Sequence, residues 1–251
     1  AQNAEVVIQK DGGKQLKDGE EKVYIETPEH FRFLKENENY TLIAYTGSKK
    51  EIELPKNING HPYSIKNFSC SAEKILIPET FSKIDDQAFC FSTVKEISLS
   101  DGITAIGKNA FENSSICRIK LADSINVIEE SAFENCRNLE FVVLPENLIE
   151  IGAASFSTCL RLQQVIFNQN LISIGENAFF SCASLEELRL PKSVKTIGAN
   201  AFAYCTNLKN VNFNKGLYKI GISAFYGTAI ESLEIPDTVA EVGSSAFGSC
   251  S

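Results

Sequence analysis

A dipeptide that returns at a nearly constant interval constrains this chain more than any other feature. Ala-Phe, once replaced by Ser-Phe, occurs eight times, and successive phenylalanines lie 22 or 23 residues apart: Phe89, Phe111, Phe133, Phe156, Phe179, Phe202, Phe225 and Phe247. A segment of this length cannot bury its own apolar side chains, so neighbouring segments must stack on one another. The spacing therefore predicts one elongated solenoid.

Apolar residues two positions apart within each repeat predict a short strand with one buried face. These pairs are Ile97/Leu99, Ile119/Leu121, Val142/Leu144, Val165/Phe167, Leu188/Leu190 and Val211/Phe213. A proline directly follows the second residue of such a pair in five coils, where a missing N–H ends strand pairing at little cost. These prolines are Pro55, Pro78, Pro145, Pro191 and Pro236. Stacking in register makes the strands a parallel sheet.

A column of glycines precedes most of the Ala-Phe pairs: Gly107, Gly152, Gly175, Gly198, Gly221 and Gly243. Asp85 takes this place once, and Asp is a strong helix N-cap, which indicates a capping role for the column. The stretch from this column to Phe is too short for a standard helix and suits a single helical turn. The expected fold class is an α/β repeat solenoid, with a parallel sheet on one face and short helical turns on the other.

The repeated frame resembles the BspA-type leucine-rich repeat, whose coils of about 23 residues end in Ile-Gly-x-x-Ala-Phe-x-x-Cys. Residues Ile174 to Cys182 have this form, and residues 40–60 resemble the entry segment with which arrays of the family open. The resemblance covers about residues 31–251 and implies the right-handed superhelix of leucine-rich repeat proteins. It also implies a bacterial protein, secreted or on the cell surface, with adhesion or binding of a host protein as its usual role.

Two parts of unequal length follow from the extent of the repeat. Residues 1–30 are interpreted as a leader or N-terminal segment, and residues 31–251 as a leucine-rich repeat domain. The apolar segments 31–34 and 40–43 predict a hairpin-like cap, about residues 31–48, that covers the open edge of the first coil. Nine coils are expected over about residues 49–251, of which the first, from Ile52 to Phe68, is irregular.

The charge of the chain disfavours two classes of partner. The sequence has 24 Lys and Arg against 32 Asp and Glu, and the net charge of -8 gives no general attraction to nucleic acid or anionic membrane. Its longest apolar runs, such as residues 141–144, are far shorter than the roughly 20 residues that cross a bilayer, so no transmembrane segment is expected. The expected partner is a protein or another extracellular macromolecule, and a monomer is favoured.

Four of the eight cysteines, at positions that differ by 23, form a column: Cys136, Cys159, Cys182 and Cys205. A zinc site needs close pairs that converge on one point, whereas this column is spread along the solenoid. A disulfide between neighbouring coils satisfies the distance, but parallel side-chain directions strain it. We expect reduced, buried thiols that serve as small apolar spacers.

Catalytic and cofactor-binding motifs are absent from the sequence. The only histidines, His30 and His61, lie in no metal or nucleophile motif, and neither Gly-x-Ser-x-Gly nor a Gly-rich phosphate loop occurs. The chain is therefore not expected to be an enzyme or to hold a cofactor or metal. We expect an adhesion-type module that binds a protein through its sheet face, and the alternative is a passive spacer that presents another domain on the cell surface.

Strand alternation locates a candidate partner-binding site on the sheet face. If Val142 and Leu144 point inward, Phe141 and Val143 point outward, and the next coil places Ile166 beside Val143. A binding surface is expected to cluster such apolar side chains among polar neighbours. The candidate site residues are Phe141, Val143 and Ile166 with a basic border of Arg118, Lys120 and Arg189.

Overall fold

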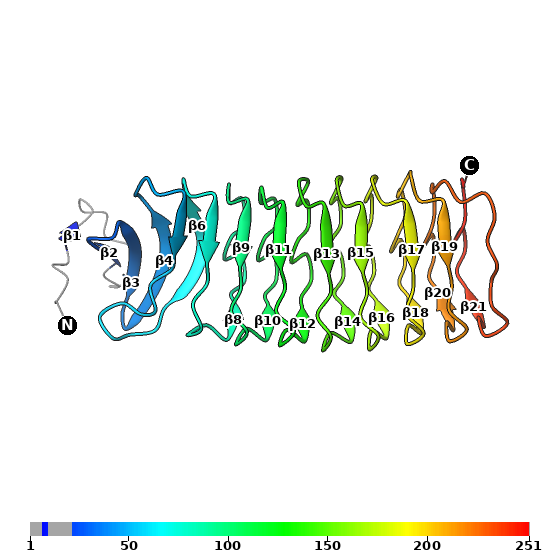
Figure 1. Cartoon of the computed structure of the whole chain (residues 1–251), viewed down its shortest axis with the longest axis horizontal. Coiled ribbons are helices and arrows are strands. Elements are labelled where there is room, and N and C mark those ends of the chain that lie inside the picture. The colour runs from blue at the N-terminus through cyan, green and yellow to red at the C-terminus, as the bar shows by residue number, and fades with distance from the viewer. Residues whose placement is uncertain (1–6, 10–21, 251) are drawn as a thin grey trace, which may run out of the picture.

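The computed structural model describes residues 7–9 and 22–250, which form a cap sheet followed by coils stacked along one axis (Figure 1). The first wall of the stack carries one three-residue strand from each of eight coils: β5 (Glu51–Glu53), β7 (Lys74–Leu76), β9 (Glu96–Ser98), β11 (Arg118–Lys120), β13 (Phe141–Val143), β15 (Gln164–Ile166), β17 (Glu187–Arg189) and β19 (Asn210–Asn212). A further pass of the chain, over residues 232–234, forms no strand.

Pairing on the first wall is parallel and in register, but it is interrupted twice. Its hydrogen-bonded groups are β5–β7–β9–β11, β13–β15 and β17–β19. Within them, equivalent residues face each other, as Ile97 faces Ile119 and Val142 faces Val165. Inward residues such as Val142 and Leu188 are buried. The predicted alternation is therefore confirmed, whereas a single continuous sheet is not formed.

The second wall consists of two-residue strands that are also parallel: β8 (Lys83–Ile84), β10 (Ala105–Ile106), β12 (Val127–Ile128), β14 (Glu150–Ile151), β16 (Ser173–Ile174), β18 (Thr196–Ile197), β20 (Lys219–Ile220) and β21 (Glu241–Val242). The glycine column follows these strands, and the Gly175 N–H donates to the Ile151 carbonyl at 2.9 Å. A Cβ on Gly175 would lie 2.6 Å from that oxygen. Close approach of two coils therefore explains this glycine, and the predicted helix-capping role is wrong.

The third wall of each coil runs from the glycine column to three residues past the repeated Phe, as residues 175–182 do. Helical turns were expected here, but no helix occurs among residues 7–9 and 22–250, so this part of the expected fold class is wrong. Asn177 has a left-handed φ of 54°, which an α-helix does not admit. The Ala178 N–H donates to Gly175 O within its coil, whereas the Phe179 N–H donates to Ala201 O of the next coil at 2.8 Å. Since every second N–H is used between coils, the segment forms turns that are hydrogen-bonded from coil to coil and not helical turns.

The phenylalanines of the third wall form one stack through the core. From Phe89 to Phe247, each ring centroid lies 4.9–5.5 Å from the next, with interplanar angles of 4–9°. The seven rings from Phe89 to Phe225 are fully buried. The repeated Ala-Phe therefore fixes the interval at which successive coils pack.

Ser155 stands where the neighbouring coils have alanine and provides a test of the packing. Its side chain is fully buried, and its Oγ has no hydrogen-bond partner among the residues that the structure describes. An unsatisfied buried hydroxyl destabilises a protein by about 1–3 kcal/mol. We therefore expect Ser155→Ala to raise the free energy of unfolding by about 1 kcal/mol in a urea titration.

Ser114→Ala is the matched control, because the buried Ser114 Oγ lies 3.4 Å from the Cys136 sulfur. Its removal breaks this contact and should lower stability. An equal gain in both variants would show that the missing partner of Ser155 is irrelevant.

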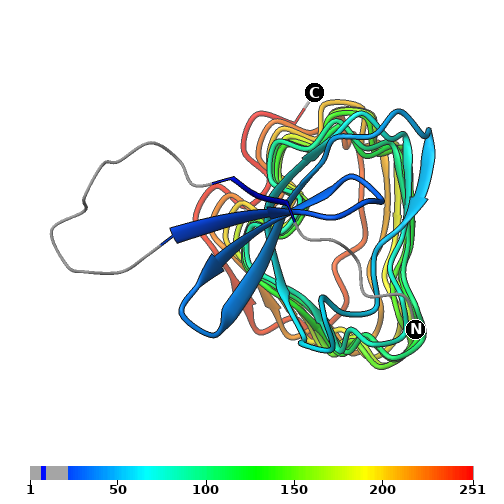
Figure 2. The ribbon, with the colours of Figure 1, turned by 90° about the vertical axis from the view of Figure 1, so that its left-hand side faces the viewer.

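A sheet of mostly antiparallel strands covers the N-terminal end of the stack (Figure 2). Its order is β1 (Val7–Gln9), β2 (Lys22–Glu26), β3 (Phe31–Glu36), β4 (Asn39–Tyr45) and β6 (Ser64–Cys70). The strands β3 and β4 pair as a hairpin, and β4 pairs in parallel with β6 of the first coil. The boundary at residue 30 stays a prediction: β2 pairs with β3 across it, and residues 1–6 and 10–21 lie outside the described part.

Candidate functional site

Three large apolar side chains are exposed together on the first wall. Phe141, Val143 and Ile166 are 44, 46 and 47% exposed, and Val143 lies directly beside Ile166 in the pairing of β13 with β15. Phe141 lies beside Gln164 in the same pairing. We call Phe141, Val143 and Ile166 the apolar patch. It occupies the strand pair that is flanked on both sides by interruptions in the hydrogen-bonded sheet.

The basic residues that were predicted to border the patch differ in whether they form an ion pair. Arg118 and Lys120 are exposed on β11, the strand before β13, and neither forms an ion pair or a side-chain hydrogen bond among the described residues. Arg189, on β17, is exposed but lies 2.6 Å from the Glu187 carboxylate of its own strand. Uncompensated positive charge therefore lies on the N-terminal side of the patch.

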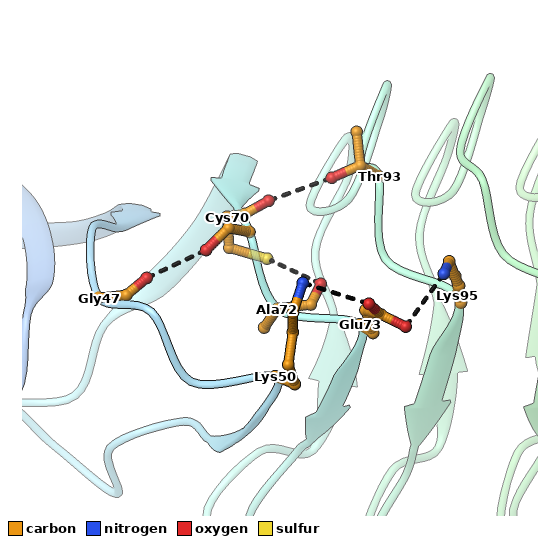
Figure 3. A network of polar contacts seen from close by, with 8 residues as sticks. Gly47, Lys50, Cys70, Ala72, Glu73, Thr93 and Lys95 are labelled. Atoms are coloured by element: carbon orange, nitrogen blue, oxygen red, sulfur yellow. Dashed lines mark hydrogen bonds and ion pairs between the residues drawn. The ribbon is translucent and has the colours of Figure 1, made fainter.

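The first wall before β11 carries charges that compensate each other from coil to coil. Glu73 lies between Lys50 and Lys95, at 3.2 and 3.0 Å (Figure 3). These two ammonium groups lower the pKa of the Glu73 carboxyl through hydrogen bonds and charge. A second row places Lys74 between Glu51 and Glu96, at 3.5 Å from each. This part of the wall is polar and largely paired from coil to coil, unlike the patch.

Exposed apolar side chains also occur on the other two walls, which were not predicted to be binding surfaces. Val127, Ile149 and Ile172 are exposed on the second wall. On the third wall the rings of Phe180 and Tyr204 lie 5.4 Å apart, and Tyr226 lies 5.6 Å beyond. The available signals were apolar residues one or two places before the second-wall Ile, and further aromatic residues one or two places after the repeated Phe. The first-wall patch is therefore one of three candidate surfaces.

The cysteine column lies in the core, and the expectation of buried, unpaired thiols is confirmed. Cys136, Cys159, Cys182 and Cys205 are 0% exposed and form no disulfide. Their role goes beyond apolar filling, because each S–H donates to a phenylalanine carbonyl of the preceding coil, as Cys182 does to Phe156 O at 3.2 Å. Burial raises the pKa of Cys136 and of Cys205 to about 12, so both thiols are protonated at neutral pH.

Hydroxyl residues replace cysteine in the coils that lack it. The equivalent position holds Ser92, Ser114 and Thr228, and the Thr228 hydroxyl donates to Phe225 O at 3.0 Å. The column therefore holds small thiol or hydroxyl side chains, although Thr228 bonds to its own coil whereas the cysteines bond to the preceding one, and sequence reasoning missed this equivalence.

A hollow lined by His61 does not gather free catalytic groups. His61 lines it with Tyr63 and Asp85, and its volume is about 420 Å³. The Tyr63 hydroxyl donates to Pro55 O at 2.5 Å, and Asp85 accepts a hydrogen bond from the Ile65 N–H at 3.0 Å. Among the described residues, no three His, Cys, Asp or Glu side chains are grouped so as to hold a metal ion, and no helix has the length and apolar character to cross a membrane.

Comparison with known families gives one match that extends over most of the chain. A model of the BspA type leucine-rich repeat region matches residues 40–140 and 127–251, with six copies of the repeat. Comparison with curated proteins found no significant match.

Solved structures of three bacterial proteins are similar. A leucine-rich repeat protein from Bacteroides ovatus has 24% identity and a TM-score of 0.71, over 85% of this chain and 59% of that one, so this chain spans less than two thirds of it. The leucine-rich repeat protein of T. pallidum has 28% identity and a TM-score of 0.58, over 80 and 88%. A leucine rich cell surface protein from Faecalibacterium prausnitzii has 18% identity and a TM-score of 0.51, over 96 and 93%. These likenesses agree with the solenoid fold.

Proposed function

The chain belongs to the BspA type leucine-rich repeat family, and from this premise we propose that it binds a protein partner through the first wall of its solenoid. Solenoids of stacked repeats present extended surfaces that serve binding. The proposed contact is the apolar patch, with Arg118, Lys120 and Arg189 around it. The proposed role is adhesion-type, and the binding itself requires no cofactor.

One observation carries the proposal: three large apolar side chains are half-exposed side by side on a wall whose other outward positions are largely polar. The same columns hold Glu51, Glu53, Glu96, Ser98, Asn210 and Asn212. Removing apolar surface from water contributes about 25 cal/mol per Å², and aromatic residues are frequent anchors of protein interfaces. A partner that covers the patch therefore gains from apolar burial at its centre.

The second and third walls offer weaker contacts. On the second wall, Glu150 and Ser173 lie beside the exposed Ile149 and Ile172 on their strands. The exposed aromatic residue of the same column, Tyr218, is separated from Ile172 by Lys195 of the coil between them. The third-wall rings pack edge to face against one another, so they cover part of their own surface. These differences favour the patch as the docking site.

We also propose that the protein works outside the cell, secreted or at the surface, as its family resemblance implies. The column thiols are compatible with an oxidising environment. They are fully buried, and burial keeps the pKa of Cys136 and of Cys205 near 12, so the reactive thiolate is scarce.

Replacing Phe141, Val143 and Ile166 together with serine should abolish partner capture without unfolding the protein. Each of these half-exposed side chains contributes about 1 kcal/mol when a partner covers it, so the three together account for roughly a 100-fold loss in affinity. Capture from the native extracellular environment, followed by titration calorimetry with the captured protein, measures the loss.

The matched control replaces Val127, Ile149 and Ile172 of the second wall with serine, which removes an equal number of exposed apolar side chains. This control should retain capture. Unchanged capture by the first-wall variant would exclude the patch, and a wild-type protein that captures nothing specific would favour the spacer role.

A further inference from the structure

Several outward charges on either side of the patch are paired with charges of their own or a neighbouring coil. In the coils before β11, Lys50 and Lys95 share Glu73, and Lys74 is shared by Glu51 and Glu96. Beyond the patch, Arg189 is held by Glu187. Arg118 and Lys120, which form no ion pair among the described residues, lie directly before the patch.

Neither of these two cations forms an ion pair among the residues that the structure describes. Arg118 faces Glu96 in the pairing of β11 with β9, but they form no ion pair among the described residues, and Glu96 contacts Lys74 at 3.5 Å. Lys120 faces Ser98, which carries no charge. On their other side the equivalent strand positions are Phe141 and Val143. Two uncompensated cations therefore adjoin a group of apolar side chains.

We propose that the partner segment that docks on the patch carries a carboxylate next to its apolar side chains, and that Arg118 and Lys120 bind this carboxylate. The inference rests on the proposed binding function and specifies the chemistry of its partner. An Arg guanidinium binds a carboxylate with two parallel hydrogen bonds, and an ammonium beside it adds a second charge. Burial of the neighbouring apolar contact excludes water, which strengthens the attraction of both cations to the carboxylate.

The dimensions of the wall set the spacing within that segment. The coils that carry β11 and β13 stack with the rings of Phe133 and Phe156 5.1 Å apart, so the carboxylate and the nearest apolar side chain of the partner lie roughly one coil spacing apart. Side chains on one face of an extended segment are two residues apart, and those on one face of a helix are three or four apart. The partner is therefore expected to carry Asp or Glu at one of these distances from an aliphatic or aromatic residue.

A protein carboxylate suits this site better than a polyanion. The net charge of -8 repels nucleic acid and anionic membrane, and two adjacent cations are too few to follow a phosphate backbone. A single acidic side chain meets both cations at short range without presenting a long array of negative charge. The asymmetry of the wall also fixes orientation, because the acidic residue must lie toward β11.

A random 12-residue phage-displayed peptide library, selected on the full chain and counter-selected on the serine variant of Phe141, Val143 and Ile166, tests the inference. The expected peptides carry Asp or Glu at the spacings given above from an apolar residue. As synthetic peptides, they should bind Arg118→Gln/Lys120→Gln at least about 10-fold more weakly than wild type, since hydrogen bonds to charged groups are strong.

A charge-matched control separates local contact from net charge. Lys192→Gln/Lys215→Gln removes two exposed lysines outside the strands of the first wall and should change affinity less than about 2-fold. Selected peptides that lack acidic residues, or that bind the Arg118/Lys120 variant as tightly as wild type, would overturn the carboxylate inference while leaving the binding function in place. If no selected peptide distinguishes wild type from the serine variant, the proposed function fails, and the inference fails with it.

Discussion

Replacing Phe179 with alanine is expected to lower the free energy of unfolding by about 3–5 kcal/mol, the cost of removing a fully buried aromatic ring. The Phe179 side chain is 0% exposed. Its ring stacks between Phe156 and Phe202, at 5.4 and 5.2 Å, and also contacts Phe167 at 6.1 Å. Because a solenoid is held together by contacts between neighbouring coils, a cavity here weakens both interfaces of the coil. Urea unfolding followed by circular dichroism measures the loss.

Phe247→Ala is the positional control, since Phe247 belongs to the same stack but has one stacked neighbour, Phe225, at 5.5 Å and is only partly buried. It should cost less than half as much as Phe179→Ala. Equal losses at the two positions would contradict the view that stacking on both sides stabilises the centre of the solenoid.

Raising the pH above 9 is expected to unfold the protein, with a midpoint between about pH 10 and 12. In the unfolded chain the column thiols lose their protons near the ordinary thiol pKa of 9.0, whereas burial raises the folded pKa of Cys136 and of Cys205 to about 12. Cys159 and Cys182 are raised well above 9.0 for the same reason. The unfolded state alone ionises in this window, so stability is fully present below pH 9 and is lost as pH rises.

The size of the effect follows from the number of thiols. Each contributes a loss of about 1.4 kcal/mol per pH unit, and four together about 5 kcal/mol per pH unit. A domain whose free energy of unfolding is about 5–15 kcal/mol therefore unfolds when the pH rises two or three units above 9. Urea titrations under reducing conditions at pH 8, 9, 10 and 11 measure the slope.

Cys205→Ser isolates the contribution of one thiol, because serine already occupies this column at Ser92 and Ser114. The variant should lose stability with pH more slowly than wild type, by about 1.4 kcal/mol per pH unit. The comparison is needed because burial also raises the pKa of Tyr63, which acts in the same direction. Identical slopes in the two proteins would show that the column thiols do not titrate as their burial requires.

Features that depend on one coil alone could be predicted from the sequence. The two-residue alternation correctly gave the inward residues, because it follows from the pleat of a strand. The 22- to 23-residue interval correctly gave the parallel strands, because equal coils stack in register. The third wall was predicted wrongly, since its N–H groups alternate between partners in the same coil and in the next one. One signal was present: Asn109, Asn177 and Asn200 recur two places before Phe, and Asn favours the left-handed region.

The candidate site could likewise be predicted only in part from the sequence. The outward direction of Phe141 and Val143 follows from strand alternation, and the structure has both exposed. The state of Arg189 could not be predicted, because its ion pair with Glu187 depends on side-chain conformation. The exposed Ile149 and Ile172 of the second wall were missed because only the first-wall columns were considered. Function as a binding surface remains a proposal for all of these residues.

Carbene footprinting of the protein alone and bound to its captured partner reports which side chains the partner covers. If the first wall binds the partner, labelling of Phe141, Val143 and Ile166 falls on binding, whereas labelling of Val127, Ile149 and Ile172 on the second wall stays unchanged. Protection confined to the second or third wall, with the first wall labelled as in the free protein, would contradict binding through the first wall.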